Sequence, residues 1–254
     1  MPAQRWLSRL VAVRPDEMRA LLWSFAYFFC LLASYYVLRP LRDEMGIAGG
    51  VRNLHWLFTA TFFVMLAAVP IFGAVVARLP RRRFIPLVYH FFVANIAIFW
   101  VLLTLDVEKQ LVARVFFVWI SVFNLFAVSV FWSFMADLFR SDQGKRLFGF
   151  IAAGGSAGAL AGPALTVWLA GPLGPVNLLI VAAVLLEAAV LCAHRLERAV
   201  PQAHATREGR PEVQAPIGGK WFAGFALLLR SPYLAGIALW VLLLSLAGTF
   251  LYFQ

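Results

Sequence analysis

Two arginines at the end of a long apolar run, Arg39 and Arg42, have the types and spacing to bind an anion. If a helix continues past the intervening proline, side chains three residues apart lie on one face of it. Together with Tyr36, the two arginines can then hold an anion by charge and hydrogen bonds. The alternative is a cluster at the membrane interface, in which the arginines pair with the acidic residues that follow, Asp43 and Glu44.

A carboxyl group also occurs near the middle of another apolar run, where Glu187 is surrounded by Ala and Leu. Burial of a carboxyl group in a membrane favours its protonated form, which is the property that proton coupling requires. The alternative is a structural glutamate that stays protonated and hydrogen-bonds a neighbouring helix. Glu187 is therefore a candidate proton switch.

A third charged set lies where the fourth apolar run ends. Asp137 and Arg140 are three residues apart, and they can pair with each other or with the arginines that precede the third run, Arg81 and Arg82. Such a pair could latch a gate in one conformation. The alternative is an ordinary salt bridge at a helix end, which is a common feature of exposed helix termini.

Helices that span a membrane are the elements that must position these residues. A hydrocarbon core about 30 Å thick needs about 20 residues of helix, and the apolar runs have this length. Runs this continuous exclude the alternating strands of a membrane barrel. We expect an all-helical membrane protein with seven spans: Ala20–Leu38, Leu54–Val76, Phe84–Leu105, Val115–Met135, Leu147–Leu169, Val176–His194 and Tyr233–Phe253.

The composition agrees with a membrane protein. Hydrophobic residues make up 63% of the chain and charged residues 13%, more apolar surface than a soluble domain can bury. Catalytic triads, phosphate-binding loops and metal-ligand clusters are absent from the sequence, and the glycines of residues 154–158 lie inside an apolar run with no strand before them. We therefore expect no enzyme activity, metal or cofactor.

The net charge of +10 is explained by topology and does not indicate a nucleic-acid partner. Of the 22 Lys and Arg residues, 17 lie in the amino-terminal segment and the even-numbered joints between runs, and 5 lie in the odd-numbered joints. The positive-inside rule then predicts a cytoplasmic amino terminus. The excess positive charge faces anionic lipid.

The joints also predict the domain organisation. Residues 1–194 are expected to form a six-helix bundle, and residues 195–220 a flexible cytoplasmic linker, because this is the one long joint and it is rich in Pro, Gly and charge. Residues 221–254 would hold an interfacial helix at Trp221–Leu229 and a seventh span that starts a second bundle. We expect the remaining spans of a twelve-span protein to lie beyond Gln254.

Two segments resemble motifs of the major facilitator superfamily. The joint between the second and third runs resembles the superfamily's loop motif, carried here by Gly73, Arg78, Arg81 and Arg82; a plain positive-inside cluster is the alternative. The fifth run resembles a motif associated with antiporters, with Gly149, Gly158, Gly162 and Pro163. Because Gly154, Gly158 and Gly162 are four residues apart, helix packing alone is the alternative for the fifth run.

Two further segments resemble the ATP/ADP translocases. These are Tyr35-x-x-Leu38-Arg39-x-x-Arg42-Asp43 and the stretch from Phe131-Trp132 through Gly144-Lys145-Arg146 to Gly149. The resemblance implies a twelve-span exchanger for an anionic substrate, including nucleotides, and it makes Arg42 the position of a family cation. In the fourth run, where that family carries a glutamate, Asn124 is the nearest polar residue. A divergent bacterial branch that carries another solute is the alternative.

Together these features predict a secondary transporter of the bacterial inner membrane that exchanges small organic anions, with membrane lipids and a carboxy-terminal bundle as its other partners. Substrate binding is expected at Tyr36, Arg39, Arg42, Asp43 and Asn124. Two functions from other classes stay open: a lipid flippase or membrane enzyme that uses Glu187 or Asp137, and a seven-span receptor or sensor.

Overall fold

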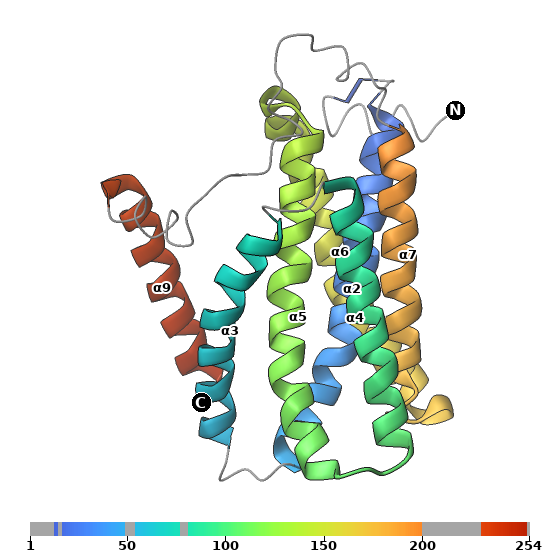
Figure 1. Ribbon diagram of the computed structural model, residues 1–254. Coiled ribbons are helices and arrows are strands. Elements are labelled where there is room, and N and C mark those ends of the chain that lie inside the picture. Colours follow the sequence, from blue (N-terminus) through green and yellow to red (C-terminus); the bar gives the residue numbers. More distant parts are fainter. Residues whose placement is uncertain (1–12, 15–16, 49–53, 77–80, 200–229, 253–254) are drawn as a thin grey trace.

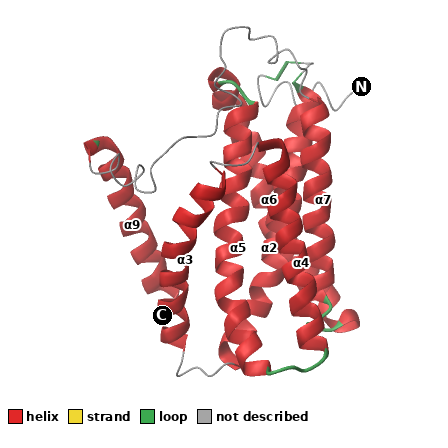
Figure 2. Cartoon of the chain, in the orientation of Figure 1, coloured by secondary structure: helices red, strands yellow, loops and turns green. Residues whose placement is uncertain are grey.

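The computed structural model describes residues 13–14, 17–48, 54–76, 81–199 and 230–252, and every regular element in these ranges is an α-helix (Figure 2). The helices are α2 (Met18–Ala48), α3 (Leu54–Val76), α4 (Arg81–Thr104), α5 (Lys109–Leu138), α6 (Ser141–Leu173), α7 (Leu178–Ala199) and α9 (Pro232–Tyr252). Each of the seven predicted apolar runs lies largely within one of these helices. The all-helical prediction is therefore confirmed.

Helices α2 to α7 alternate in direction and form a six-helix bundle (Figure 1). α2 lies at its centre and packs against α5, α6 and α7; α4 packs against α5 and α7, and α3 packs against α5. The up-and-down order follows from the short connections between consecutive helices, which leave no room for a crossover. We call the end at which α2, α4 and α6 begin the amino-terminal end of the bundle, and the other the opposite end.

Aromatic side chains fill the middle of the bundle. The rings of Phe28 on α2 and Phe131 on α5 are stacked, with centroids 4.1 Å apart. Beside them, the Tyr27 hydroxyl donates to the Tyr89 hydroxyl over 2.6 Å, and Tyr89 donates to the carbonyl oxygen of Ala127 over 3.1 Å. A buried hydroxyl without a partner would be costly, so this chain of bonds joins α2, α4 and α5 at a defined register.

The outside of the bundle is apolar, as a lipid-facing surface should be. Phe62, Phe91, Leu160 and Trp168, from three different helices, are each more than half exposed. A soluble domain of this size does not expose so many large apolar side chains. Five of the described helices, α2, α4, α5, α6 and α7, are long and apolar enough to cross a membrane, and the described parts of α3 and α9 contain shorter apolar segments.

The predicted start of the linker falls inside a helix. α7 continues to Ala199, so residues 195–199, expected in the linker, are helical. The rest of the linker and the interfacial helix expected at Trp221–Leu229 lie outside the described residues. α9 lies outside the six-helix bundle, beyond α3 (Figure 1), and side chains such as Trp240 are exposed along it.

Candidate functional site

The two candidate anion-binding arginines lie on one helix, because α2 continues through Pro40 as far as Ala48. Arg42 is largely enclosed. Its Nε and Nη2 donate to Asp43 Oδ1 over 3.0 and 2.7 Å, and its guanidinium lies 5.0 Å from the ring centroid of Phe117 on α5. Its side chain is only 13% exposed. Arg42 is thus neutralised by Asp43 and attached to α5, as the interface alternative predicted for this one arginine.

Arg39 has a different environment. Its guanidinium lies 5.6 Å from the ring centroid of Tyr36, one turn earlier on α2, and its side chain is half-buried. Within the described part of the chain, no carboxylate lies at ion-pair distance from Arg39. Of the two arginines, Arg39 is therefore the one whose charge is available to a ligand.

Four of the five predicted substrate-binding residues form two pairs near the end of α2: Arg39 with Tyr36, and Arg42 with Asp43. The fifth, Asn124, is half-buried on α5. It lies seven residues after Phe117, which is two turns, or about 10 Å, along the same face of that helix. Asn124 is therefore on the side of α5 that Arg42 contacts, but towards the middle of the bundle.

The glycines of α6 pack directly on the backbone of α2. A Cβ atom added to Gly158 would lie 2.3 Å from the carbonyl oxygen of Phe29, and one added to Gly154 would lie 2.6 Å from that of Phe25. A Cβ atom on Gly162 would lie 2.6 Å from the Cβ atom of Tyr36. These three glycines allow two helices to approach more closely than any residue with a side chain permits, so helix packing is their observed role.

Gly149 does not belong to this contact. It is exposed, and a Cβ atom added there meets no described atom within 4 Å. Pro163 lies within α6, half-buried, and the helix continues past it to Leu173. A turn later, the Thr166 hydroxyl donates to Val37 O of α2 over 3.4 Å and to Gly162 O over 3.1 Å. The α2–α6 contact therefore extends from Gly154 nearly to the opposite end of the bundle.

At the amino-terminal end, the same two helices are joined by a network centred on Glu17. Its carboxylate accepts hydrogen bonds from Gln143 Nε2 over 2.9 Å, from Arg146 Nη2 over 3.0 Å and from the Arg14 amide over 3.1 Å. Burial alone would raise the pKa of Glu17, but these bonds outweigh burial and hold its pKa below the usual value. Sequence reasoning missed this network, because Gln143 and Arg146 are more than 120 residues away from Glu17.

The expected pairing of Asp137 with Arg140 needs correction. The two residues do not share a helix, because α5 ends at Leu138 and Phe139 has an extended backbone. Arg140 precedes α6 and its amide donates to Gln143 Oε1 over 3.0 Å, while its side chain lies 3.5 Å from Asp142. The prediction assumed that Asp137 and Arg140 lie one turn apart on a single helix. A new helix starts at Ser141, so the two side chains do not share a helix face.

The pairing of Asp137 with the arginines before the third run is not described by the structure. Gly73 lies within α3, and Arg81 and Arg82 lie within the first turn of α4, but their side chains are outside the description. Arg78 lies outside the described residues altogether. The gating role of this joint therefore stays a prediction.

Glu187 is on the surface of the bundle and not in its interior. Its side chain is 44% exposed, and its Oε2 lies 3.5 Å from Nε2 of His90 on α4. Its neighbours Leu186 and Ala189 on α7 are buried, whereas Glu187 lies beside α4, and its role as a proton switch stays a prediction. Sequence reasoning missed His90, although an ionisable residue within the third apolar run was a signal that could have found it.

The sequence from residue 23 to residue 254 matches the family model of the Major Facilitator Superfamily. Searches among curated proteins and among solved structures found no match. The family match covers most of the chain, and the bundle of long apolar helices is consistent with it. The chain therefore belongs to the Major Facilitator Superfamily, as a multi-pass membrane protein of a family of secondary transporters.

Proposed function

We propose that this protein exchanges small organic anions across the membrane and that Arg39 is the main cation of its substrate site. The observation that carries this proposal is the contrast between the two arginines of α2. Arg42 is neutralised by Asp43, whereas Arg39 lies over the ring of Tyr36 and has no carboxylate at ion-pair distance among the described residues. An anionic substrate would supply the countercharge that Arg39 lacks.

The burial of Arg39 strengthens its attraction for anions. It lies at the end of the apolar run of α2 with its side chain half-buried, and a charge partly withdrawn from water interacts more strongly with a counter-ion than a fully exposed charge does. A guanidinium also matches a carboxylate or phosphate with two parallel hydrogen bonds. Tyr36, one turn away, can add a hydroxyl donor, and Asp43 keeps Arg42 in place beside the site.

Alternating access in this account moves the bundle as a body against a second bundle. The backbone-close contact between α2 and α6 supports a rigid carrier of the arginine site, with the fifth-run glycines setting the helix spacing. The distribution of Lys and Arg supports a cytoplasmic amino terminus, and we propose the bacterial inner membrane as its location.

Nucleotide exchange is the form of this activity that the sequence resemblance favours. Of the two segments that resemble ATP/ADP translocases, the arginine segment carries the proposed site. The second segment serves packing: Phe131 stacks on Phe28, and the ring of Trp132 contacts that of Phe148 on α6, with centroids 5.6 Å apart. The support for a nucleotide therefore rests on the arginine segment alone.

Counterflow into proteoliposomes tests the proposal. The full-length protein is reconstituted and loaded with unlabelled ADP, and uptake of labelled ATP, labelled inorganic phosphate and a labelled dicarboxylate is followed in parallel. Saturable uptake of one of these anions that depends on an internal anion supports the exchanger. Uptake of none of them, together with transbilayer movement of a labelled lipid, would replace it with the flippase.

A further inference from the structure

Three arginines lie together at the amino-terminal end of the contact between α2 and α7. Arg195 of α7 lies over the ring of Trp23 on α2, with its guanidinium carbon 5.9 Å from the ring centroid. Arg19 precedes Trp23 by one turn of α2, and Arg198 follows Arg195 by about one turn of α7. Residues one turn apart share a helix face, so both arginines lie on the side of the Trp23 contact. All three arginines are exposed.

The directions of the two helices bring these arginines to similar depths. The Ser34 hydroxyl of α2 donates to the carbonyl oxygen of Ala182, near the start of α7, over 2.7 Å. The Trp23 contact is nearer to the start of α2 and nearer to the end of α7, so the two helices run antiparallel. The turn before Trp23 in α2 therefore lies beside the last turn of α7. Arg19 and Arg198 occupy these two turns, about 5 to 6 Å beyond the ring along the helix axis.

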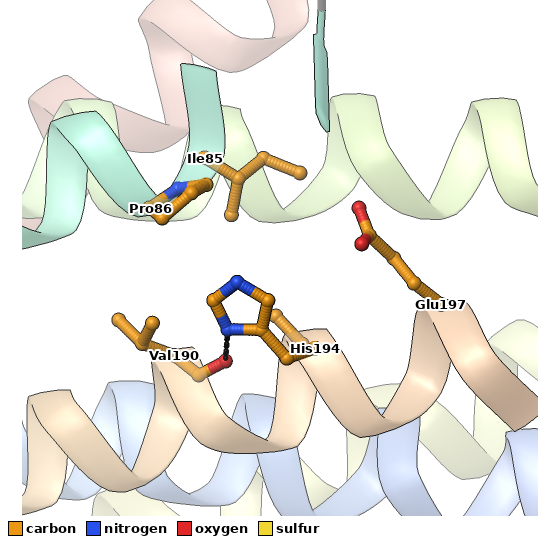
Figure 3. A pocket seen from close by; sticks show the side chains of 6 residues that line it. Ile85, Pro86, Val190, His194 and Glu197 are labelled. Carbon is orange, nitrogen blue, oxygen red and sulfur yellow. Dashed lines mark hydrogen bonds between the residues drawn. The ribbon is translucent and has the colours of Figure 1, made fainter. Parts of the chain in front are cut away.

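No acidic side chain in the described part of the chain neutralises the three arginines. None of them has a carboxylate at ion-pair distance. Glu17, two residues before Arg19, is buried and paired with Arg146 of α6. Glu197 lies on the α4 side of α7, where it lines a small pocket with Ile85 (Figure 3). The three positive charges therefore have no countercharge among the described residues.

Apolar side chains continue the same surface along the membrane-spanning length of both helices. On α2, Ala26 follows Trp23 by about one turn and is half-buried. On α7, Leu191 precedes Arg195 by one turn and is 55% exposed, and Val184 is 62% exposed. Trp23 therefore lies where a charged surface changes to an apolar one. Tryptophan is enriched at this level of membrane proteins, between the lipid headgroups and the hydrocarbon.

A phospholipid with a net negative charge has the chemistry that this surface recognises. Its phosphate supplies the missing countercharge, and guanidinium groups bind phosphate oxygens through paired, charge-assisted hydrogen bonds. Its acyl chains extend along the apolar part of the surface, at the depth where only lipid or another helix can lie. A zwitterionic lipid is a poorer ligand, because its headgroup brings a cation of its own to three arginines.

We propose that the α2–α7 surface at the amino-terminal end is a binding site for an anionic phospholipid. Arg19, Arg195 and Arg198 surround the phosphate, and Trp23 lies beside the start of the acyl chains. The bound lipid connects the first and the last helix of the six-helix bundle and stabilises their contact. The proposal requires that these particular cations select the lipid, whereas a general attraction of positive charge for the membrane would make all cations at this end equivalent. It does not depend on which substrate is carried.

Native mass spectrometry of the delipidated full-length protein tests the site. The protein is titrated with an equimolar mixture of phosphatidylglycerol and phosphatidylcholine. We expect the first bound lipid to favour phosphatidylglycerol about tenfold. The preference should disappear in the double variant Arg195→Gln/Arg198→Gln and persist in the control Arg14→Gln/Lys145→Gln, which removes two exposed cations at the same end of the bundle. Loss of the preference in both double variants, or in neither, would overturn the proposal.

Two further measurements separate the site from misfolding and from a site for free phosphate. Arg19→Gln/Arg198→Gln keeps the contact between Arg195 and Trp23, so it should lose the preference while its melting temperature without lipid equals that of the control. Preference for phosphatidylglycerol in this folded variant would contradict the proposal. Millimolar glycerol 3-phosphate, which is the headgroup without chains, should not displace the lipid. Displacement would show a site for soluble anions and overturn the assignment to a lipid.

Discussion

The contact between α2 and α6 and the contact between α4 and α7 join helices in opposite ways. α6 approaches the α2 backbone through glycines, and a buried carboxylate with three donors closes the amino-terminal end. α4 and α7 are joined by polar side chains that are half exposed, and a pocket separates them near one end. The first contact has the features of a rigid joint. The second has those of a looser contact.

Substitution of Gly158 should have the largest effect on stability. In Gly158→Val, the Cβ atom would lie 2.3 Å from a backbone oxygen of α2, which cannot move without separating the helices. We expect a loss of about 3 kcal/mol, measured as a fall in the apparent melting temperature in detergent. Gly149→Ala is the control, since its Cβ atom meets open space; it should be neutral or slightly stabilising. Equal losses of stability in Gly158→Val and Gly149→Ala would refute the close packing of α6 on the α2 backbone.

Removal of the carboxylate that closes this contact should have the next largest effect. Glu17→Gln weakens the bonds from Gln143 and Arg146, at an expected cost of roughly 2 kcal/mol at neutral pH. Because the pKa of Glu17 is lower in the folded than in the unfolded chain, its contribution is fully present above the ordinary glutamate value, about 4.3. It is lost as the pH falls through the folded value.

The difference in melting temperature between the unmodified protein and Glu17→Gln should therefore shrink as the pH falls from about 5 to about 3. Asp142→Asn provides the control, because Asp142 is exposed and its partner Arg140 lies 3.5 Å away at the surface. A difference that stays constant over this pH range would show that the network acts through shape and not through charge.

The polar contact between α4 and α7 predicts a smaller effect at the opposite end of the bundle. Trp100 Nε1 donates to Asn177 Oδ1 over 3.0 Å, and Trp100→Phe keeps an aromatic ring while removing the donor. We expect a loss of about 1 kcal/mol or less, since the bond is exposed. A double-mutant cycle with Asn177→Ala should show that the two changes are not additive. If Trp100→Phe lost as much stability as Gly158→Val, the α4–α7 contact would be as rigid as the α2–α6 contact, and the proposed difference between them would be wrong.

The sequence predicted the helices because span length and apolarity depend on local composition. For Arg39 and Arg42 to lie on one helix face, the helix had to continue past Pro40. α2 does continue past Pro40, as far as Ala48. Depth in the membrane follows from position along a run. The positions of Arg39, Glu187 and the α6 glycines along their helices were therefore available before the structure.

The sequence did not predict how each helix is rotated about its axis, or which residues far apart in the chain contact each other. The sequence does not determine whether Glu187 points into the bundle or toward α4, and its neighbour His90 lies 97 residues earlier. Gln143 and Arg146 meet Glu17 only because α2 and α6 begin at the same end of the bundle. The error at Arg140 was local: a helix was extended across Phe139, although the polar residues 140–143 fit a helix start.

Counterflow by Arg39→Gln is the measurement that tests the central claim most directly. With Lys109→Gln as the control, since this exposed lysine is paired with Asp106 at the same end of the bundle, anion exchange is measured in proteoliposomes at several substrate concentrations. The account predicts that Arg39→Gln weakens the apparent affinity on the order of 100-fold, that Arg39→Lys recovers part of it, and that the control is unchanged. Exchange by Arg39→Gln with the affinity of the unmodified protein would contradict the claim that Arg39 binds the substrate.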